Sequence, residues 1–212
     1  MSRLNWRPVA LALALTLVVA GCNNGAAPKG TKTADGSTPT AQDSGDGAAR
    51  ARAATTVLDK ASMLPKGWLP VPTEGRLSGP PGRPAYCGVS VEPKPIRQSA
   101  LVLYEEDPTQ RRVLQYTFVS TERSAKAVMD KLRVAASPCR EVGFTVDKAT
   151  AVTPVGDDFV ALDYRTDSGA TSRTTIFRAR DTIIVLVAYG TLGVPTEATQ
   201  SIAAKIDELL AG

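Results

Sequence analysis

Ile183-Ile184-Val185-Leu186-Val187-Ala188 is a run of six apolar residues that ends shortly before Gly190. Successive side chains of a β-strand point to opposite faces, so a strand of this composition buries both faces. The run therefore predicts the central strand of a sheet. The residues before it, 172–179, alternate between polar and apolar side chains, and the turn Arg180-Asp181-Thr182 makes the two segments neighbouring strands.

Strand signals recur along the chain on the amino-terminal side of this pair. Asp107-Pro108-Thr109-Gln110 and Asp167-Ser168-Gly169 are turn sequences that separate some of them. Short turns between sequential strands favour antiparallel pairing. The six predicted strands are residues 98–105, 111–120, 145–152, 159–166, 172–179 and 183–189.

Helical periodicity marks three segments. Residues 121–136 give the clearest signal, because Thr121 can cap a helix that carries one apolar stripe. Residues 55–64 predict a short first helix, and Pro195-Thr196 opens a last one. This order of elements predicts the α+β class, a mostly antiparallel sheet with helices packed on one face.

The amino terminus carries an export signal. Arg3 and Arg7 precede a short apolar run, residues 9–20, which is too short to span a bilayer. Ala20-Gly21-Cys22 then resembles the lipobox of bacterial lipoproteins. The resemblance implies that residues 1–21 are removed and that Cys22 is lipidated and anchored in the cell membrane, on its extracytoplasmic face. The alternative is an ordinary signal peptide with an incidental cysteine.

Residues 22–52 are predicted to be the lipidated cysteine and a flexible tether. Their Gly, Ser, Thr, Ala and Asp content shows no apolar periodicity and offers little surface to bury. The folded domain is predicted to cover residues 53–212. Without Arg3 and Arg7 the mature chain has 23 Lys+Arg against 21 Asp+Glu, and no basic run indicates nucleic-acid binding.

Three cysteines fit an exported protein. Once Cys22 carries lipid, Cys87 and Cys139 remain as an even pair in an oxidising compartment, which predicts a disulfide. Two free buried thiols are the alternative. Such a bond would tie the end of the helix at 121–136 to the loop before the first predicted strand.

The composition argues against an enzyme. The chain has no histidine, which excludes Ser-His-Asp and Cys-His catalysis and removes the commonest metal ligand. We therefore expect no cofactor and no metal. Glu105-Glu106-Asp107 and Asp157-Asp158 could form an acid–base pair or a calcium site, but charged residues near strand ends are more often solvated turns.

A Pro- and Gly-rich loop, residues 65–86, offers a place for a binding site, because long irregular loops often serve a function. Trp68 and Tyr86 lie in it and are the predicted ligand-binding residues. Trp68 is the only tryptophan of the mature chain, since Trp6 lies in the signal. The competing interpretation of Trp68 is an anchor in the core.

The layout resembles the PknH-type extracellular sensor domains of actinobacteria, which also occur as free-standing lipoproteins. Leu64-Pro65-Lys66-Gly67-Trp68, Cys87-Gly88, the strand pair, the helix ending before Cys139 and the closing strand–helix unit carry the resemblance. It implies an α+β sensor domain with a cleft over residues 53–212. Those domains often hold two disulfides, whereas this chain has cysteines for one.

Two functions follow as hypotheses. The first is a membrane-anchored extracytoplasmic lipoprotein that binds a small or amphiphilic ligand. The second is a module that docks a protein of the cell envelope and has no ligand pocket. A cavity of roughly 300 Å³ or more between sheet and helices favours the first, and a solid core with an exposed apolar patch favours the second.

Overall fold

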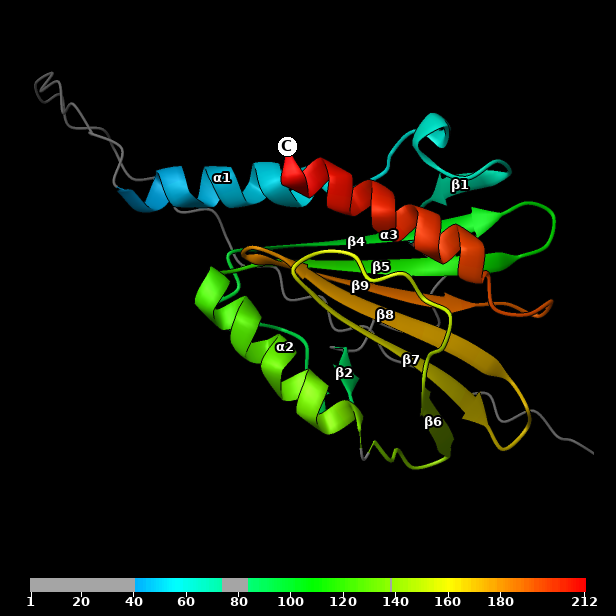
Figure 1. Ribbon diagram of the computed structural model, residues 1–212. Coiled ribbons are helices and arrows are strands. Elements are labelled where there is room, and N and C mark those ends of the chain that lie inside the picture. The colour runs from blue at the N-terminus through cyan, green and yellow to red at the C-terminus, as the bar shows by residue number, and fades with distance from the viewer. Residues whose placement is uncertain (1–40, 74–83, 138) are drawn as a thin grey trace, which may run out of the picture. The chain divides into compact units, whose positions relative to one another are not determined.

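A seven-stranded antiparallel sheet forms the centre of the computed structural model, which describes residues 41–73, 84–137 and 139–212 (Figure 1). Its strand order is β1-β4-β5-β9-β8-β7-β6, and β2 pairs with β3 in a separate small hairpin. The strands are β1 (Trp68–Val71), β2 (Ala85–Tyr86), β3 (Val89–Ser90), β4 (Gln98–Glu106), β5 (Arg111–Val119), β6 (Phe144–Lys148), β7 (Asp158–Thr166), β8 (Thr171–Ala179) and β9 (Thr182–Tyr189). The helices are α1 (Ala41–Thr55), the 3-10 turn η1 (Ala61–Met63), α2 (Glu122–Ala136) and α3 (Thr196–Ala211).

The sequence-based class is confirmed, since the fold is α+β and its sheet is antiparallel throughout. β9, which contains the run at 183–188, is the middle strand of the seven, as predicted. β4, β5, α2, β7, β8, β9 and α3 each lie within one or two residues of their predicted bounds. β6 ends at Lys148, four residues before the predicted end of that strand.

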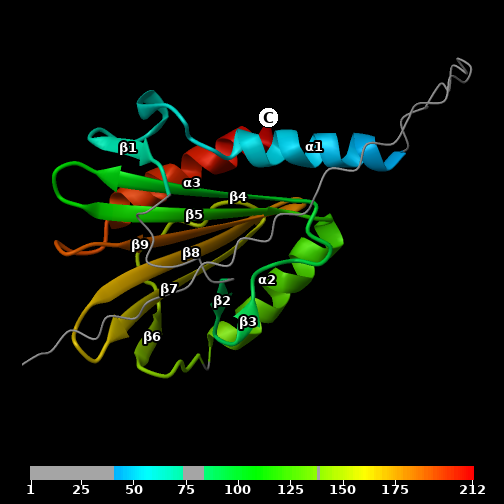
Figure 2. The ribbon, with the colours of Figure 1, turned by 180° about the vertical axis from the view of Figure 1, so that it is seen from behind.

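Helices cover both faces of the sheet, not one. α1 and α3 lie on one face and α2 on the other, where the β2–β3 hairpin lies beside it (Figures 1 and 2). Along β9, Ile184 and Leu186 belong to the core under α3, whereas Ile183 and Val185 belong to the core under α2. A strand that is apolar on both faces needs cover on both, so the expectation of one covered face was wrong.

The amino-terminal part of the domain also differs from expectation. Helix α1 begins at Ala41, so residues 41–52 are not part of a flexible tether. Ala49 and Ala53, one helical turn apart, are buried against Val119, and Arg52 pairs with Asp181 across 2.7 Å. The helix predicted at residues 55–64 is only the end of α1 followed by η1. Residues 1–40, with Cys22, lie outside the described residues.

A buried hydrogen-bond network fixes the segment after α1 to the sheet. The Tyr104 hydroxyl donates to Gln115 Oε1 at 2.7 Å and accepts from the Leu58 amide at 3.2 Å. Gln115 Nε2 lies 3.0 Å from the Thr56 carbonyl and 2.9 Å from Thr117 Oγ1. Burial raises the pKa of Tyr104, so the hydroxyl keeps its proton and its role as donor.

Replacing Gln115 with leucine is therefore expected to reduce the free energy of unfolding by about 2–3 kcal/mol, because buried donors and acceptors lose their partner. Urea denaturation measures the change. Gln200→Leu is the control, since the Gln200 amide donates to the Thr153 carbonyl at an exposed position. Equal losses of unfolding free energy in Gln115→Leu and Gln200→Leu would contradict the claim that the buried network stabilises the fold.

Candidate functional site

A groove lies between α2 and the outer strands β6 and β7. Its volume is about 960 Å³, which is ample for a small ligand. The carboxyl-terminal part of α2 forms one wall, and the segment at residues 149–157, which connects β6 to β7, forms the rim. The lining residues are Arg133, Ala136, Ser137, Val146, Asp147, Lys148, Ala149, Val152, Pro154, Gly156, Asp157, Asp158, Phe159, Val160, Ala161 and Leu162.

Apolar side chains dominate the part of the groove that lies on the sheet. Val160 and Leu162 of β7 belong to the core under α2, and Val146 and Ala136 pack against that core. β6 pairs with β7 only from Leu162 to Thr166, so the first residues of β7 lie beyond the end of β6. The groove thus exists because β6 is shorter than β7.

An ion-pair network closes the groove on the side of β8. Arg178, which is almost fully buried, lies 2.5 Å from Asp158 and 3.2 Å from Asp157. Arg133 of α2 also pairs with Asp158 and lies 2.9 Å from Asp130. The two aspartates therefore have cationic partners that fix α2 and the rim to the sheet. Asp157 is exposed, as expected of a solvated turn, but Asp158 begins β7 and its side chain is only 10% exposed.

The rim is fixed by backbone contacts at Gly156 and Asp157. The Asp157 amide donates to the Arg178 carbonyl at 2.7 Å, and the Gly156 amide donates to Asp207 of α3 at 3.0 Å. Gly156 has φ +70°, which lies in the left-handed region where glycine is favoured. The rim is consequently held by both β8 and α3.

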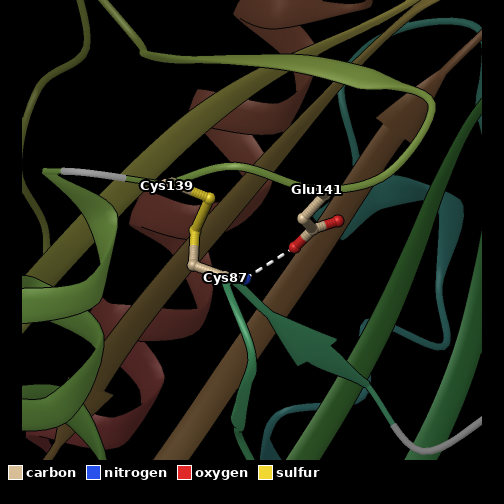
Figure 3. Close-up of side chains that lie close together, drawn as sticks. All are labelled: Cys87, Cys139 and Glu141. Carbon is tan, nitrogen blue, oxygen red and sulfur yellow. Dashed lines mark hydrogen bonds between the residues drawn. A yellow bond between two sulfur atoms is a disulfide. The ribbon is translucent and has the colours of Figure 1, made fainter.

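The predicted disulfide is present. Cys87, in the turn of the β2–β3 hairpin, is bonded to Cys139, which follows α2 (Figure 3). The Glu141 carboxylate accepts a hydrogen bond from the Cys87 amide at 2.6 Å. Cys87, Cys139 and Glu141 bring potential metal ligands within 4.8 Å. Because the sulfurs are bonded to each other and are not thiolates, this cluster offers a metal only one carboxylate.

The structure does not bring the two predicted ligand-binding residues together. Trp68 is 3% exposed and lies in the core under α3, as the competing core-anchor interpretation has it. Tyr86 packs against the core under α2, where its ring lies 6.2 Å from that of Tyr164, and burial raises its pKa. Neither residue lines the groove. Residues 74–83 of the Pro-rich loop lie outside the described residues.

The acidic cluster at the β4–β5 turn is paired with basic residues. Glu106 accepts two hydrogen bonds from Arg111, at 2.6 and 2.8 Å, and Glu105 pairs with Arg112 across 2.7 Å. The arginine partners support a structural role for the two glutamates, but Glu105 and Glu106 are half-buried residues of β4 and only Asp107 lies in the turn, so the expectation of a solvated turn was wrong for both glutamates. The bonds from Arg111, and a further one from Thr109, lower the pKa of Glu106 below its ordinary value.

A depressed folded-state pKa makes Glu106 stabilising above its unfolded pKa of about 4.3, and this contribution is lost as the pH falls through the folded pKa. Glu106→Gln should remove at most about 1 kcal/mol near pH 7 and progressively less in acid. Urea denaturation at several pH values measures this. Asp107→Asn is the control, because Asp107 pairs with no cation among the described residues. A loss of stability in Glu106→Gln that does not change with pH would contradict the lowered pKa of Glu106.

The groove was missed in the sequence, although residues 149–157 carried a usable signal. Pro154 and Gly156 interrupt the strand pattern there, as proline and glycine do in the loop at 65–86 that received the site prediction. The apolar lining belongs to strands, where periodicity does not distinguish the wall of a groove from a core.

No protein-family model, no curated protein and no solved structure matches this chain. By its fold and its groove, the chain is an α+β domain whose antiparallel sheet is covered by helices on both faces and which has a groove between α2 and the outer strands β6 and β7. Within residues 41–73, 84–137 and 139–212, no helix is both long and apolar enough to cross a membrane.

Proposed function

We propose that this protein is a lipoprotein, anchored through Cys22 to the extracytoplasmic face of the cell membrane, that binds a small or amphiphilic ligand. The groove between α2 and β7 carries the proposal, because its volume of about 960 Å³ exceeds the roughly 300 Å³ expected of a ligand pocket. The proposal makes the chain a non-enzymatic binding protein, in keeping with its resemblance to PknH-type sensor domains.

The lining favours an amphiphile. Val146, Val160 and Leu162 supply an apolar floor on which an acyl or other hydrocarbon segment would be removed from water. Lys148 is exposed at the groove, and it has no ion-pair partner in the described part of the chain. A polar end group of the ligand would lie near the Lys148 ammonium group. Arg133 and Asp158 would remain paired with each other.

A dansyl-labelled fatty acid tests this site. The protein, purified in a neutral detergent, is expected to bind the probe with a rise in dansyl emission, since the label enters an apolar environment. Ala136→Phe places an aromatic ring in the groove and should weaken binding about tenfold or more. Ala127→Phe, on the exposed side of the same helix, should leave the affinity unchanged.

The alternative, a docking module for an envelope protein, is favoured by two exposed apolar residues, Val142 in the connection between α2 and β6 and Phe144 at the start of β6. If the probe does not bind, or if both phenylalanine variants bind it like the wild type, the groove proposal fails and docking becomes the better account. Melting curves of both variants, taken alongside, identify any loss of binding that comes from unfolding.

The anchor has its own test. Cys22→Ser removes the thiol that would carry lipid, and we expect it to abolish lipidation and the processing that depends on it. Fractionation of cells, with mass spectrometry of the amino-terminal peptide, measures both. A serine variant that is still cleaved after Gly21 and remains with the membranes would contradict anchoring through Cys22.

A further inference from the structure

Three arginines from separate elements line two adjoining cavities at the end of the sheet where the β8–β9 turn meets α2. Arg52 comes from α1, Arg97 precedes β4, and Arg180 lies in the turn between β8 and β9. The cavities have volumes of about 340 and 490 Å³ and share these arginines and Asp181. They share no lining residue with the groove between α2 and β7.

The protein itself leaves much of this positive charge unpaired. Arg52 Nε is bound by Asp181 at 2.7 Å and Thr182 Oγ1 at 3.1 Å, but its Nη2 is buried without a hydrogen-bond partner. Arg97 and Arg180 are exposed, and their side chains form no ion pair or hydrogen bond with the described residues.

Two side-chain carboxylates lie at these cavities, and the carboxyl-terminal residue Gly212 also lines the larger one. The Asp181 carboxylate is bound to Arg52. Glu122 is 72% exposed, and its nearest cationic partner is Arg178 at 3.9 Å. Neither side-chain carboxylate is within ion-pair distance of Arg97 or Arg180, so the smaller cavity, with three arginines against these two carboxylates, keeps an excess of positive charge.

The chemistry of this arrangement suits a phosphate group. A guanidinium presents a planar set of donors that binds phosphate oxygens in a bidentate manner. The smaller cavity also includes Ser120, the N-cap residue Thr121 and Glu122, the first residue of α2, and a helix N-terminus favours anions. We propose that Arg52, Arg97 and Arg180 bind a phosphate group, carried by the headgroup of an anionic lipid or by a free phosphorylated solute.

The test uses the full chain in a neutral detergent. Inorganic phosphate is titrated in one arm, and phosphatidylglycerol is added to the micelles in the other, while the melting temperature and the affinity are measured. We expect saturable stabilisation that weakens as the salt concentration rises. Arg97→Gln and Arg180→Gln should each weaken binding about tenfold, because each removes charge-assisted hydrogen bonds.

Arg140→Gln is the matched control, since Arg140 is exposed, lies away from both cavities and pairs with no described residue. It should bind like the wild type, and all three variants should keep the wild-type melting temperature without ligand. Stabilisation by phosphate alone supports a free solute as the ligand, and stabilisation by phosphatidylglycerol alone supports a lipid headgroup. No saturable stabilisation in either arm, or an equal loss in Arg140→Gln, overturns the site.

Discussion

Gly156→Ala is expected to reduce the free energy of unfolding by roughly 3–5 kcal/mol. The new Cβ would lie 2.4 Å from the Arg178 carbonyl oxygen and 3.3 Å from the ring of Phe177. Arg178 belongs to β8, next to the central strand, and its carbonyl already accepts the Asp157 amide at 2.7 Å. The rim has to move, so the cost combines the strain of a positive φ with steric overlap.

Gly169→Ala separates these two costs. Gly169 also has a positive φ, +86°, but nothing lies within 4 Å of its added Cβ. The free energy of unfolding of Gly169→Ala should therefore fall by only about 1 kcal/mol. Urea denaturation of both variants measures the difference, and the dansyl probe should bind Gly156→Ala more weakly because the displaced residues form the rim of the groove. Equal losses of stability would contradict a tight contact at Gly156.

Replacing both Cys87 and Cys139 with serine is expected to reduce the free energy of unfolding by about 4 kcal/mol. The bond closes a loop with a sequence separation of 52 residues, and loop-closure entropy gives this magnitude. The bond also joins the β2–β3 hairpin to the end of α2, which is a wall of the groove. The probe should therefore bind the double variant more weakly.

Urea denaturation measures this loss, and peptide mapping without reduction detects the cross-link in the wild type. Reducing the wild-type protein should reproduce the stability of the double variant, which serves as an internal control. The account of the disulfide is wrong if both thiols react with an alkylating agent in the native protein, or if reduction leaves the stability unchanged.

Most of the sheet was predictable because its signals are local. The run at residues 183–188 located the central strand, and the turns at 107–110 and 180–182 defined hairpins that the structure contains. The same run is apolar on both faces, and helices accordingly cover both faces of the sheet and not the single face predicted. The even pair of cysteines was sufficient to predict the disulfide.

The errors concern segments whose structure depends on distant contacts. α1 contains no apolar residue larger than alanine, and it packs through Ala49 and Ala53, which are small enough to approach Val119 closely. Trp68 follows a turn sequence that predicts a loop residue, whereas it begins β1 and pairs with Glu106 of the neighbouring strand β4. The groove depends on where β6 ends relative to β7, and a single sequence does not fix that relation.

The central claim is that the groove between α2 and β7 binds an amphiphile from the protein's own environment. Native mass spectrometry of the protein purified from its host in a neutral detergent tests it most directly. The account predicts a non-covalently bound small molecule in the wild type and in Ala127→Phe, and its loss in Ala136→Phe with the fold retained. A wild-type protein that carries no such molecule, or an Ala136→Phe variant that retains it, would contradict the claim.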